Sequence, residues 1–261
     1  MPATRFGTHP DVPDHRDRAF VGRPSGAALP RRVDLTPRCP PVFNQGTVLN
    51  SCSAQAIAAA MWFLEQRDDR TADHRPPEAD SAPPSRLFLY YNERARAGLT
   101  GSNAPVSLRD GYKSIAEQGI CAESSWPYRN DRFAVKPPPA CYRAALAHRA
   151  IAYFRLRREL SQFRACLAAG YPFAMGISVY QSFIGKAVAR SGVVSMPGRH
   201  ERHLGGHAML VVGYDDTARQ FIVRNSAGPR WGRRGYCVMP YAYLLNEQLA
   251  WDFWMVRRQG K

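Results

Sequence analysis

Residues 41–64 read PVFNQGTVLNSCSAQAIAAAMWFL, and this stretch decides the fold. Asn50 or Ser51 can cap a helix that runs from about Cys52 to Arg67. Apolar side chains on nearly every face of that helix predict that it is buried at the centre of the molecule. A helix N-terminus favours the thiolate form of a cysteine, and the thiolate is the nucleophilic form. The stretch therefore predicts both a core helix and a nucleophile, Cys52.

The composition of the 261-residue chain is that of a globular protein, with 45% hydrophobic and 22% charged residues. This length suits one large domain or two small ones that share a cleft. Residues 1–10 contain no apolar signal-peptide core, and the longest apolar run, 56–64, is about half of a membrane span. We expect a monomer that is cytoplasmic by default and contacts no membrane, with export by a route without a signal peptide left open.

The net charge of +15 raises the question of a polyanionic partner. No long basic block is present, so we do not expect nucleic acid to bind. The six cysteines include no C-x-x-C pair, which argues against a structural zinc site. His200, His203 and His207 could suggest a metal cluster, but no acidic residue stands at a metal-site spacing from them. We therefore expect neither a metal nor another cofactor.

The order of predicted elements indicates an α+β fold with two lobes. Residues 1–32 are rich in Pro, Asp, Arg and Gly and predict an extended arm. A mainly helical lobe is expected over residues 33–136 and a β-rich lobe over 137–261. Besides the first helix, we expect helices at 85–97, 107–118 and 159–168, loops at 68–84 and 121–141, and strands at 149–156, 173–180, 207–214, 220–226 and 235–239.

Catalysis of acyl transfer by a cysteine needs four parts: an activated thiol, a histidine, a group that orients the imidazole, and donors for the oxyanion. Cys52 supplies the thiol. His207 follows paired glycines that allow close approach of backbone, and Asn225 ends the next strand, so a hairpin with its turn at residues 215–216 can place the two side by side. The Asn225 amide oxygen would fix the imidazole tautomer. Gln45 and the backbone N–H of Cys52 would stabilise the oxyanion.

Together these motifs resemble the papain-like cysteine peptidases, over roughly residues 33–256. The resemblance is carried by the order Cys52, His207, Asn225 and by four sequence runs. These are PVFNQG at 41–46, GHA at 206–208, NSxGxxWGxxGY at 225–236, and GI at 119–120 followed by WPY at 126–128. It is strongest toward bacterial members that lack a long prosegment. It implies a two-lobed fold, a helical lobe plus a β-barrel-like lobe, with the active-site cleft between them.

The chain also departs from the family pattern. Ser53 stands where the family usually has an aromatic residue after the nucleophile, and residues 48–51 lack the upstream cysteine of a common family disulfide. The loop from Gln45 to Cys52 is one residue longer than usual, which bears on the oxyanion role of Gln45. Ala227 replaces a tryptophan that shields the Asn–His hydrogen bond from water, so we expect a more exposed bond here.

The resemblance implies that Cys52 attacks the carbonyl of a peptide or protein substrate and forms a covalent acyl-enzyme. Three alternatives remain open at this point. An amine or thiol could capture the acyl group, as in a transamidase, cyclase or peptide ligase. The chain could instead be a catalytically impaired binding protein for an anionic ligand. In the third, the arm at residues 1–32 lies in the cleft and blocks it.

Overall fold

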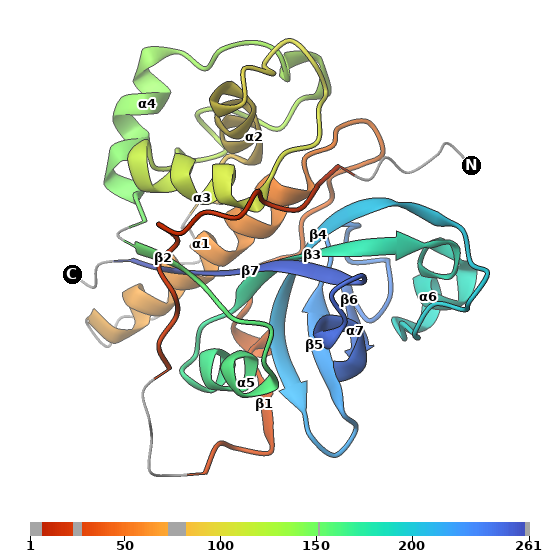
Figure 1. The fold of residues 1–261 in the computed structure, drawn as a ribbon. Helices are drawn as coiled ribbons and strands as arrows, with labels where there is room; N and C mark the ends of the chain where they lie inside the picture. The colour runs from red at the N-terminus through yellow and green to blue at the C-terminus, as the bar shows by residue number, and fades with distance from the viewer. Residues whose placement is uncertain (1–6, 23–27, 73–81, 151, 259–261) are drawn as a thin grey trace.

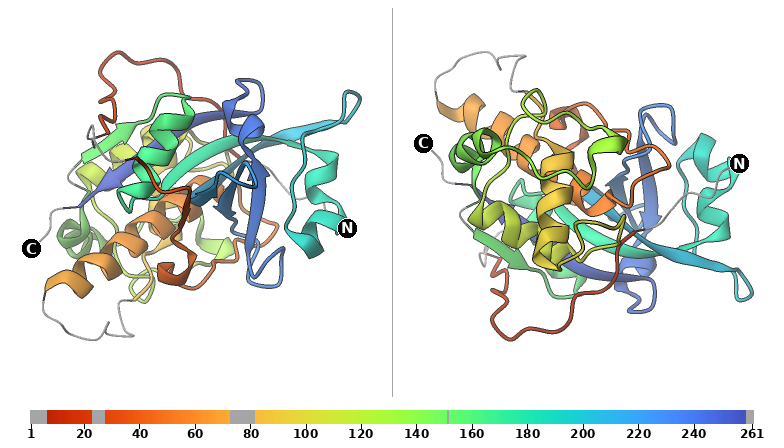
Figure 2. Two further views of the ribbon diagram at one scale, coloured as in Figure 1. Left: turned by 90° about the horizontal axis from the view of Figure 1, so that it is seen from below. Right: turned by 90° about the horizontal axis from the view of Figure 1, so that it is seen from above.

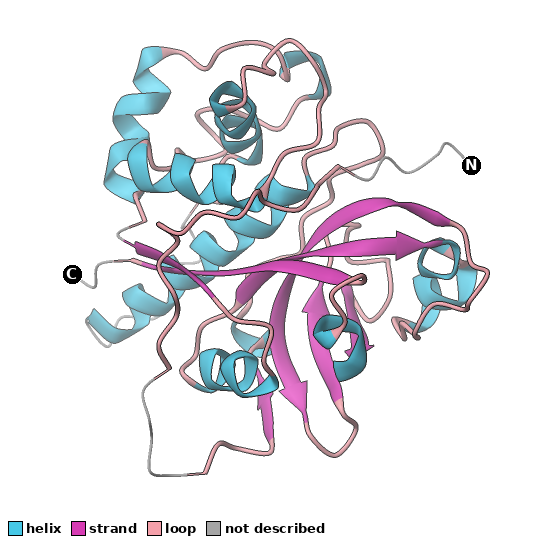
Figure 3. Cartoon of the chain, in the orientation of Figure 1, coloured by secondary structure: helices cyan, strands magenta, loops and turns pink. Residues whose placement is uncertain are grey.

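In the protein, one buried helix separates a group of helices from an antiparallel sheet (Figures 1 and 3). The structure is a computed structural model that describes residues 7–22, 28–72, 82–150 and 152–258, with backbone alone for 67–72. This mixed arrangement confirms the predicted α+β fold. The division into lobes at residue 136 stays a prediction.

The helical side is built from α1 (Cys52–Ala72), α2 (Arg86–Arg96), α3 (Leu108–Glu117) and α4 (Pro139–Ala145). The first three were predicted, although α1 continues past the predicted end at Arg67. The fourth lies at the end of the segment predicted as a loop. Of the other predicted loop, 68–84, residues 68–72 belong to α1 and residues 73–81 lie outside the described residues.

The sheet orders its strands β2-β7-β3-β4-β5-β6, and β1 pairs with β4. All pairs are antiparallel, and the bounds are β1 (Arg32–Asp34), β2 (Ala152–Arg155), β3 (Phe173–Tyr180), β4 (His203–Asp215), β5 (Gln220–Arg224), β6 (Tyr236–Pro240) and β7 (Ala250–Arg257). The predicted hairpin is β4 and β5, in which Leu210 faces Arg224. The sequence analysis missed β1 and β7.

Three short helices surround the sheet: α5 (Leu160–Ala168), α6 (Lys186–Ser191) and α7 (Tyr241–Leu245). Only α5 was predicted. In both views of Figure 2, α6 lies at the opposite end of the molecule from the C-terminal end of α1. The short turn η4 (Gln181–Ile184) directly precedes α6 and carries the buried Phe183.

The centre of the core is α1, which packs on β4 of the sheet and on α2 and α3. Every residue of α1 from Cys52 to Glu65 is buried, as its apolar sequence predicted. Five of them are alanines, at positions 54, 56, 58, 59 and 60. Short side chains allow the helix backbone to approach the sheet closely, which brings the first turn of α1 against β4.

Gly119 ends α3 at a point where no larger residue fits. Its φ is +76°, and a Cβ built there would lie 1.8 Å from the carbonyl oxygen of Ala145. The conformation is left-handed, which a residue with a side chain adopts only at a cost in free energy. The tight contact fixes the end of α3 against α4.

We expect Gly119→Ala to lower the free energy of unfolding by about 3 kcal/mol or more, since strain and overlap add together. Gly98→Ala is the matched control: its φ is +70° but no atom lies within 4 Å of the added Cβ. That control should cost about 1 kcal/mol. Denaturant unfolding measures both, and equal losses in the two variants would refute the close contact.

Candidate active site

Cys52 is the first residue of α1 and is fully buried. The backbone N–H groups of Ala208, Gly7 and Ser53 lie near its sulfur and lower its pKa, against the effect of burial. Ala208 directly follows His207 in β4, so the packing of α1 on β4 brings the thiol beside the imidazole-bearing residue. The structure therefore brings together the nucleophile and the histidine that the sequence singled out.

His207 on β4 and Asn225, directly after β5, lie next to each other, as predicted from the hairpin. His207 Nε2 lies 2.9 Å from Asn225 Oδ1. Since an amide oxygen only accepts, Nε2 carries the hydrogen and Nδ1 is the basic nitrogen of the neutral ring. The Asn225 oxygen is held in turn by the backbone N–H of Ser226 at 2.8 Å.

The expected exposure of this pair beside Ala227 is not seen, because His207 and Asn225 are each 6% exposed. The ring of Phe183 packs beside the imidazole, with 6.2 Å between ring centroids. Burial of a hydrogen bond in a low dielectric strengthens it. The Phe183 side chain from η4 thus excludes water from one face of the His207 imidazole. The sequence did not predict this role.

Gln45 is buried in the loop before α1, despite the longer spacing to Cys52. Its backbone N–H donates to Ser226 O at 2.9 Å, and the Ser226 hydroxyl donates to Gln45 Oε1 at 2.6 Å. The hydroxyl of Tyr128 donates to the Gln45 carbonyl at 3.1 Å. Because Oε1 accepts from Ser226, the Gln45 amide nitrogen is oriented as a donor. The sequence did not indicate this role for Ser226.

The pKa of the Cys52 thiol is raised to about 11, chiefly by burial and in spite of the backbone N–H groups. Burial lowers the pKa of His207, and the Asn225 hydrogen bond opposes that shift. Both shifts favour the uncharged forms of the two groups. Burial thus acts in the opposite direction to the helix N-terminus, which by itself favours the thiolate, and burial is the larger effect.

Ser53, the unusual residue after the nucleophile, donates a hydrogen bond of 2.6 Å to Glu93 Oε1. Glu93 lies on α2 and is fully buried, which raises the pKa of its carboxyl to about 8. A neutral carboxylic acid therefore lies beneath the first turn of α1 at pH 7. The sequence offered no signal for it, because Glu93 stands in an ordinary charged helix segment.

At Thr8 the arm connects the helical side to the sheet. The Thr8 N–H donates to Gly206 O at 3.3 Å, on β4, and its hydroxyl donates to Val106 O at 2.8 Å, just before α3. A Cβ at Gly206 would lie 2.1 Å from the Thr8 carbonyl oxygen. The glycine thus permits the close backbone approach expected of it. With Gly7 against the sulfur, the arm is part of what buries Cys52.

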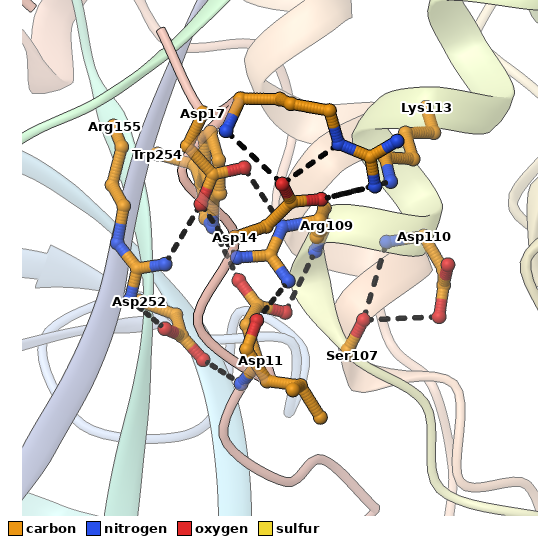
Figure 4. Close-up of polar contacts among 12 residues, drawn as sticks. Asp11, Asp14, Asp17, Ser107, Arg109, Asp110, Lys113, Arg155, Asp252 and Trp254 are labelled. Atoms are coloured by element: carbon orange, nitrogen blue, oxygen red, sulfur yellow. Dashed lines mark hydrogen bonds and ion pairs between the residues drawn. The ribbon is translucent and has the colours of Figure 1, made fainter. Parts of the chain in front are cut away.

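Charged side chains anchor the arm farther along, as Figure 4 shows. Asp17 accepts from Arg109 of α3 at 2.5 and 2.9 Å and from Arg155 of β2 at 3.0 Å. Asp11 accepts from the ring N–H of Trp254 at 2.8 Å, and its backbone N–H donates to Asp252. The arm is therefore bound to both sides of the groove. These partners come from distant segments, so sequence reasoning missed them.

The three histidines at 200, 203 and 207 do not lie in the same environment. His200 and His203 are exposed, whereas His207 is buried. Over the described ranges, no group of three or more His, Cys, Asp or Glu is arranged to hold a metal ion. All six cysteines lie in those ranges as free thiols. No helix among the described residues is long and apolar enough to span a membrane.

Comparisons with known proteins show what this chain is similar to. Residues 100–246 match the model of the family described as papain family cysteine protease. An uncharacterized peptidase C1-like protein of Acanthamoeba polyphaga mimivirus is 35% identical over 235 residues, covering 87% of this chain and 73% of the relative.

Among solved structures, xylellain, a cysteine protease from Xylella fastidiosa, superimposes with a TM-score of 0.87 at 39% identity. The match covers 98% of this chain and 96% of xylellain. A digestive procathepsin L2 proteinase of Tenebrio molitor gives a TM-score of 0.75 at 19% identity, covering 99% of this chain and 79% of that one, and shows the shared fold.

The raised thiol pKa predicts how Cys52 reacts in the full-length chain. Because the thiolate fraction below a pKa of about 11 grows tenfold per pH unit, alkylation by iodoacetamide should keep accelerating from pH 7 to pH 10. Peptide mapping by mass spectrometry at each pH gives the rate at Cys52, with Cys52→Ser as the blank. A rate that is already constant from pH 6 upward would mean that the thiolate exists at rest.

Proposed function

Because this chain belongs to the papain family of cysteine proteases, we propose that it hydrolyses peptide bonds through a covalent acyl-enzyme on Cys52. The observation that carries the proposal is a set of contacts around four residues, at the start of α1 and on the β4–β5 hairpin. Cys52 begins α1 beside Ala208, His207 bonds Asn225 at 2.9 Å, and Gln45 is fixed by Ser226.

Each residue has a defined role in the proposed reaction. His207 takes the thiol proton at Nδ1 as Cys52 attacks the carbonyl carbon, and the Cys52 backbone N–H and the Gln45 amide stabilise the oxyanion. His207 then protonates the leaving nitrogen, and the C–N bond breaks. In the second half, His207 takes a proton from water, the resulting hydroxide attacks the thioester carbonyl, the C–S bond breaks to release the acid, and the proton returns to the Cys52 sulfur. Asn225 holds the imidazole in the tautomer that these transfers need.

We propose further that the arm blocks this site until it moves. Thr8 fills the groove between Gly206 and Val106, and Gly7 lies against the sulfur of Cys52. A substrate carbonyl must reach that sulfur, so the arm and a substrate cannot both occupy the position beside Cys52. Displacement of the arm would also return water to Cys52 and His207, which lowers the desolvation that holds the pair neutral. Access and activation would thus change together.

Cys52→Ala is expected to lower hydrolysis of internally quenched peptides by at least about a thousandfold, because the acyl-enzyme cannot form. Cys39→Ala, which removes a half-buried thiol elsewhere, should retain the wild-type rate. Mass spectrometry of the products with and without an added amine distinguishes hydrolysis from acyl transfer. Equal activity in Cys52→Ala and the wild type would end the proposal.

Gly7→Leu tests the blocking role in the full-length chain. A Cβ at Gly7 would lie 2.3 Å from the Cβ of Asn50, so a leucine must push the arm away from Cys52. We expect alkylation of Cys52 at pH 7 to accelerate by at least about tenfold, since the accessible population rises. The matched control is Gly101→Leu, at a position with no atom within 4 Å. Unchanged labelling in Gly7→Leu would show that the arm does not limit access.

A further inference from the structure

A cavity of about 380 Å³ opens beside His207. Its walls include Gln45 from the loop before α1, Phe183 from η4, and Ala227 and Trp231 from the segment after β5. None of the described arm residues 7–22 lines it. The cavity is thus separate from the part of the groove that the arm fills, and its volume lies in the range of about 300–1,000 Å³ that is usual for ligand pockets.

Aromatic and aliphatic side chains form one part of the wall, and polar side chains that include His207 form the rest. The rings of Phe183 and Trp231 lie 5.8 Å apart between centroids at an interplanar angle of 40°. Ile184, on the same wall, is 47% exposed. Among the described residues that line the cavity there is no Lys, Arg, Asp or Glu, although the chain carries a net charge of +15. A charged group placed here would lose its hydration without gaining a partner.

The size of the cavity depends on residue 227. Ala227 is exposed and lines the cavity, and its backbone is held in an antiparallel bridge with Asn44. Since the backbone is fixed, a longer side chain at this position would project into the volume that the methyl group leaves open. The same residue that departs from the family pattern therefore creates this space.

If the proposed function is correct, the position of the cavity indicates which residue of the substrate it binds. His207 must lie within hydrogen-bond reach of the leaving nitrogen, and Gln45 within reach of the carbonyl oxygen of the same bond. Both border this cavity. The residue that contributes the leaving nitrogen therefore lies at its mouth. We propose that the cavity binds a large apolar side chain, such as Phe or Leu, of the substrate residue directly after the scissile bond, and that Ala227 determines this specificity.

The test uses the full-length chain and four internally quenched peptides that differ only in the residue after the scissile bond: Phe, Leu, Ala or Asp. The wild type should cleave the Phe and Leu peptides with kcat/KM at least about tenfold above the Ala and Asp peptides. Equal values for all four peptides would overturn the pocket and leave peptide hydrolysis intact. If none of the four peptides is cleaved either by the wild type or by Gly7→Leu, in which the arm is displaced, the proposed function fails, and this inference fails with it.

Ala227→Trp should fill the cavity and reduce the ratio of kcat/KM for Phe over Ala to about one or below. The ratio is an internal measure, so a general change in rate does not affect it. Val135→Trp, at a 49% exposed position outside the cavity, adds the same bulk and should keep the wild-type ratio. Ala227→Leu gives a smaller shift in the same direction and serves if the tryptophan variant does not fold. A wild-type ratio in both Ala227 variants would overturn the assignment of Ala227.

Discussion

The packing of α1 on β4 is the contact on which the rest of the molecule depends. The first turn of α1 must lie close enough to the sheet for the sulfur of Cys52 to contact the backbone at Ala208. Alanines along the helix allow this approach, and beneath the same turn the buried Ser53 hydroxyl donates to Glu93 Oε1. A larger side chain at that contact would move the nucleophile away from His207, because cores transmit changes in volume to their neighbours.

Burial has opposite consequences for structure and for chemistry at this site. It strengthens the His207–Asn225 and Gln45–Ser226 hydrogen bonds, which orient the groups that act on a substrate. It also raises the pKa of the Cys52 thiol and lowers that of His207, which keeps the nucleophile protonated while the arm is in place. Ion pairs hold the arm to α3 on the helical side and to β2 on the sheet, so the arm is anchored on both sides of the molecule.

The sequence predicted the parts of the fold that local patterns determine. Continuous apolar character located α1, the paired glycines and the turn at residues 215–216 located the β4–β5 hairpin, and the shared motifs identified the family, which the comparisons confirm. The sequence did not predict the contacts that depend on residues far apart in the chain. The acidic residues of the arm did not indicate that Arg109 and Arg155 would be their partners. Strand β7, near the end of the chain, was not predicted either. The Cys52 pKa was predicted in the wrong direction because the helix N-terminus is visible in sequence and the covering arm is not.

The central claim is that an acyl group passes through Cys52. Rapid mixing of the full-length chain with a peptide thioester, quenching in acid and measuring the intact mass tests this claim directly. We expect a transient mass increase of one acyl group, mapped to Cys52 and absent from Cys52→Ala. Release of the acid product with no acyl group on Cys52 at any quenching time, and at an equal rate in Cys52→Ala, would contradict it.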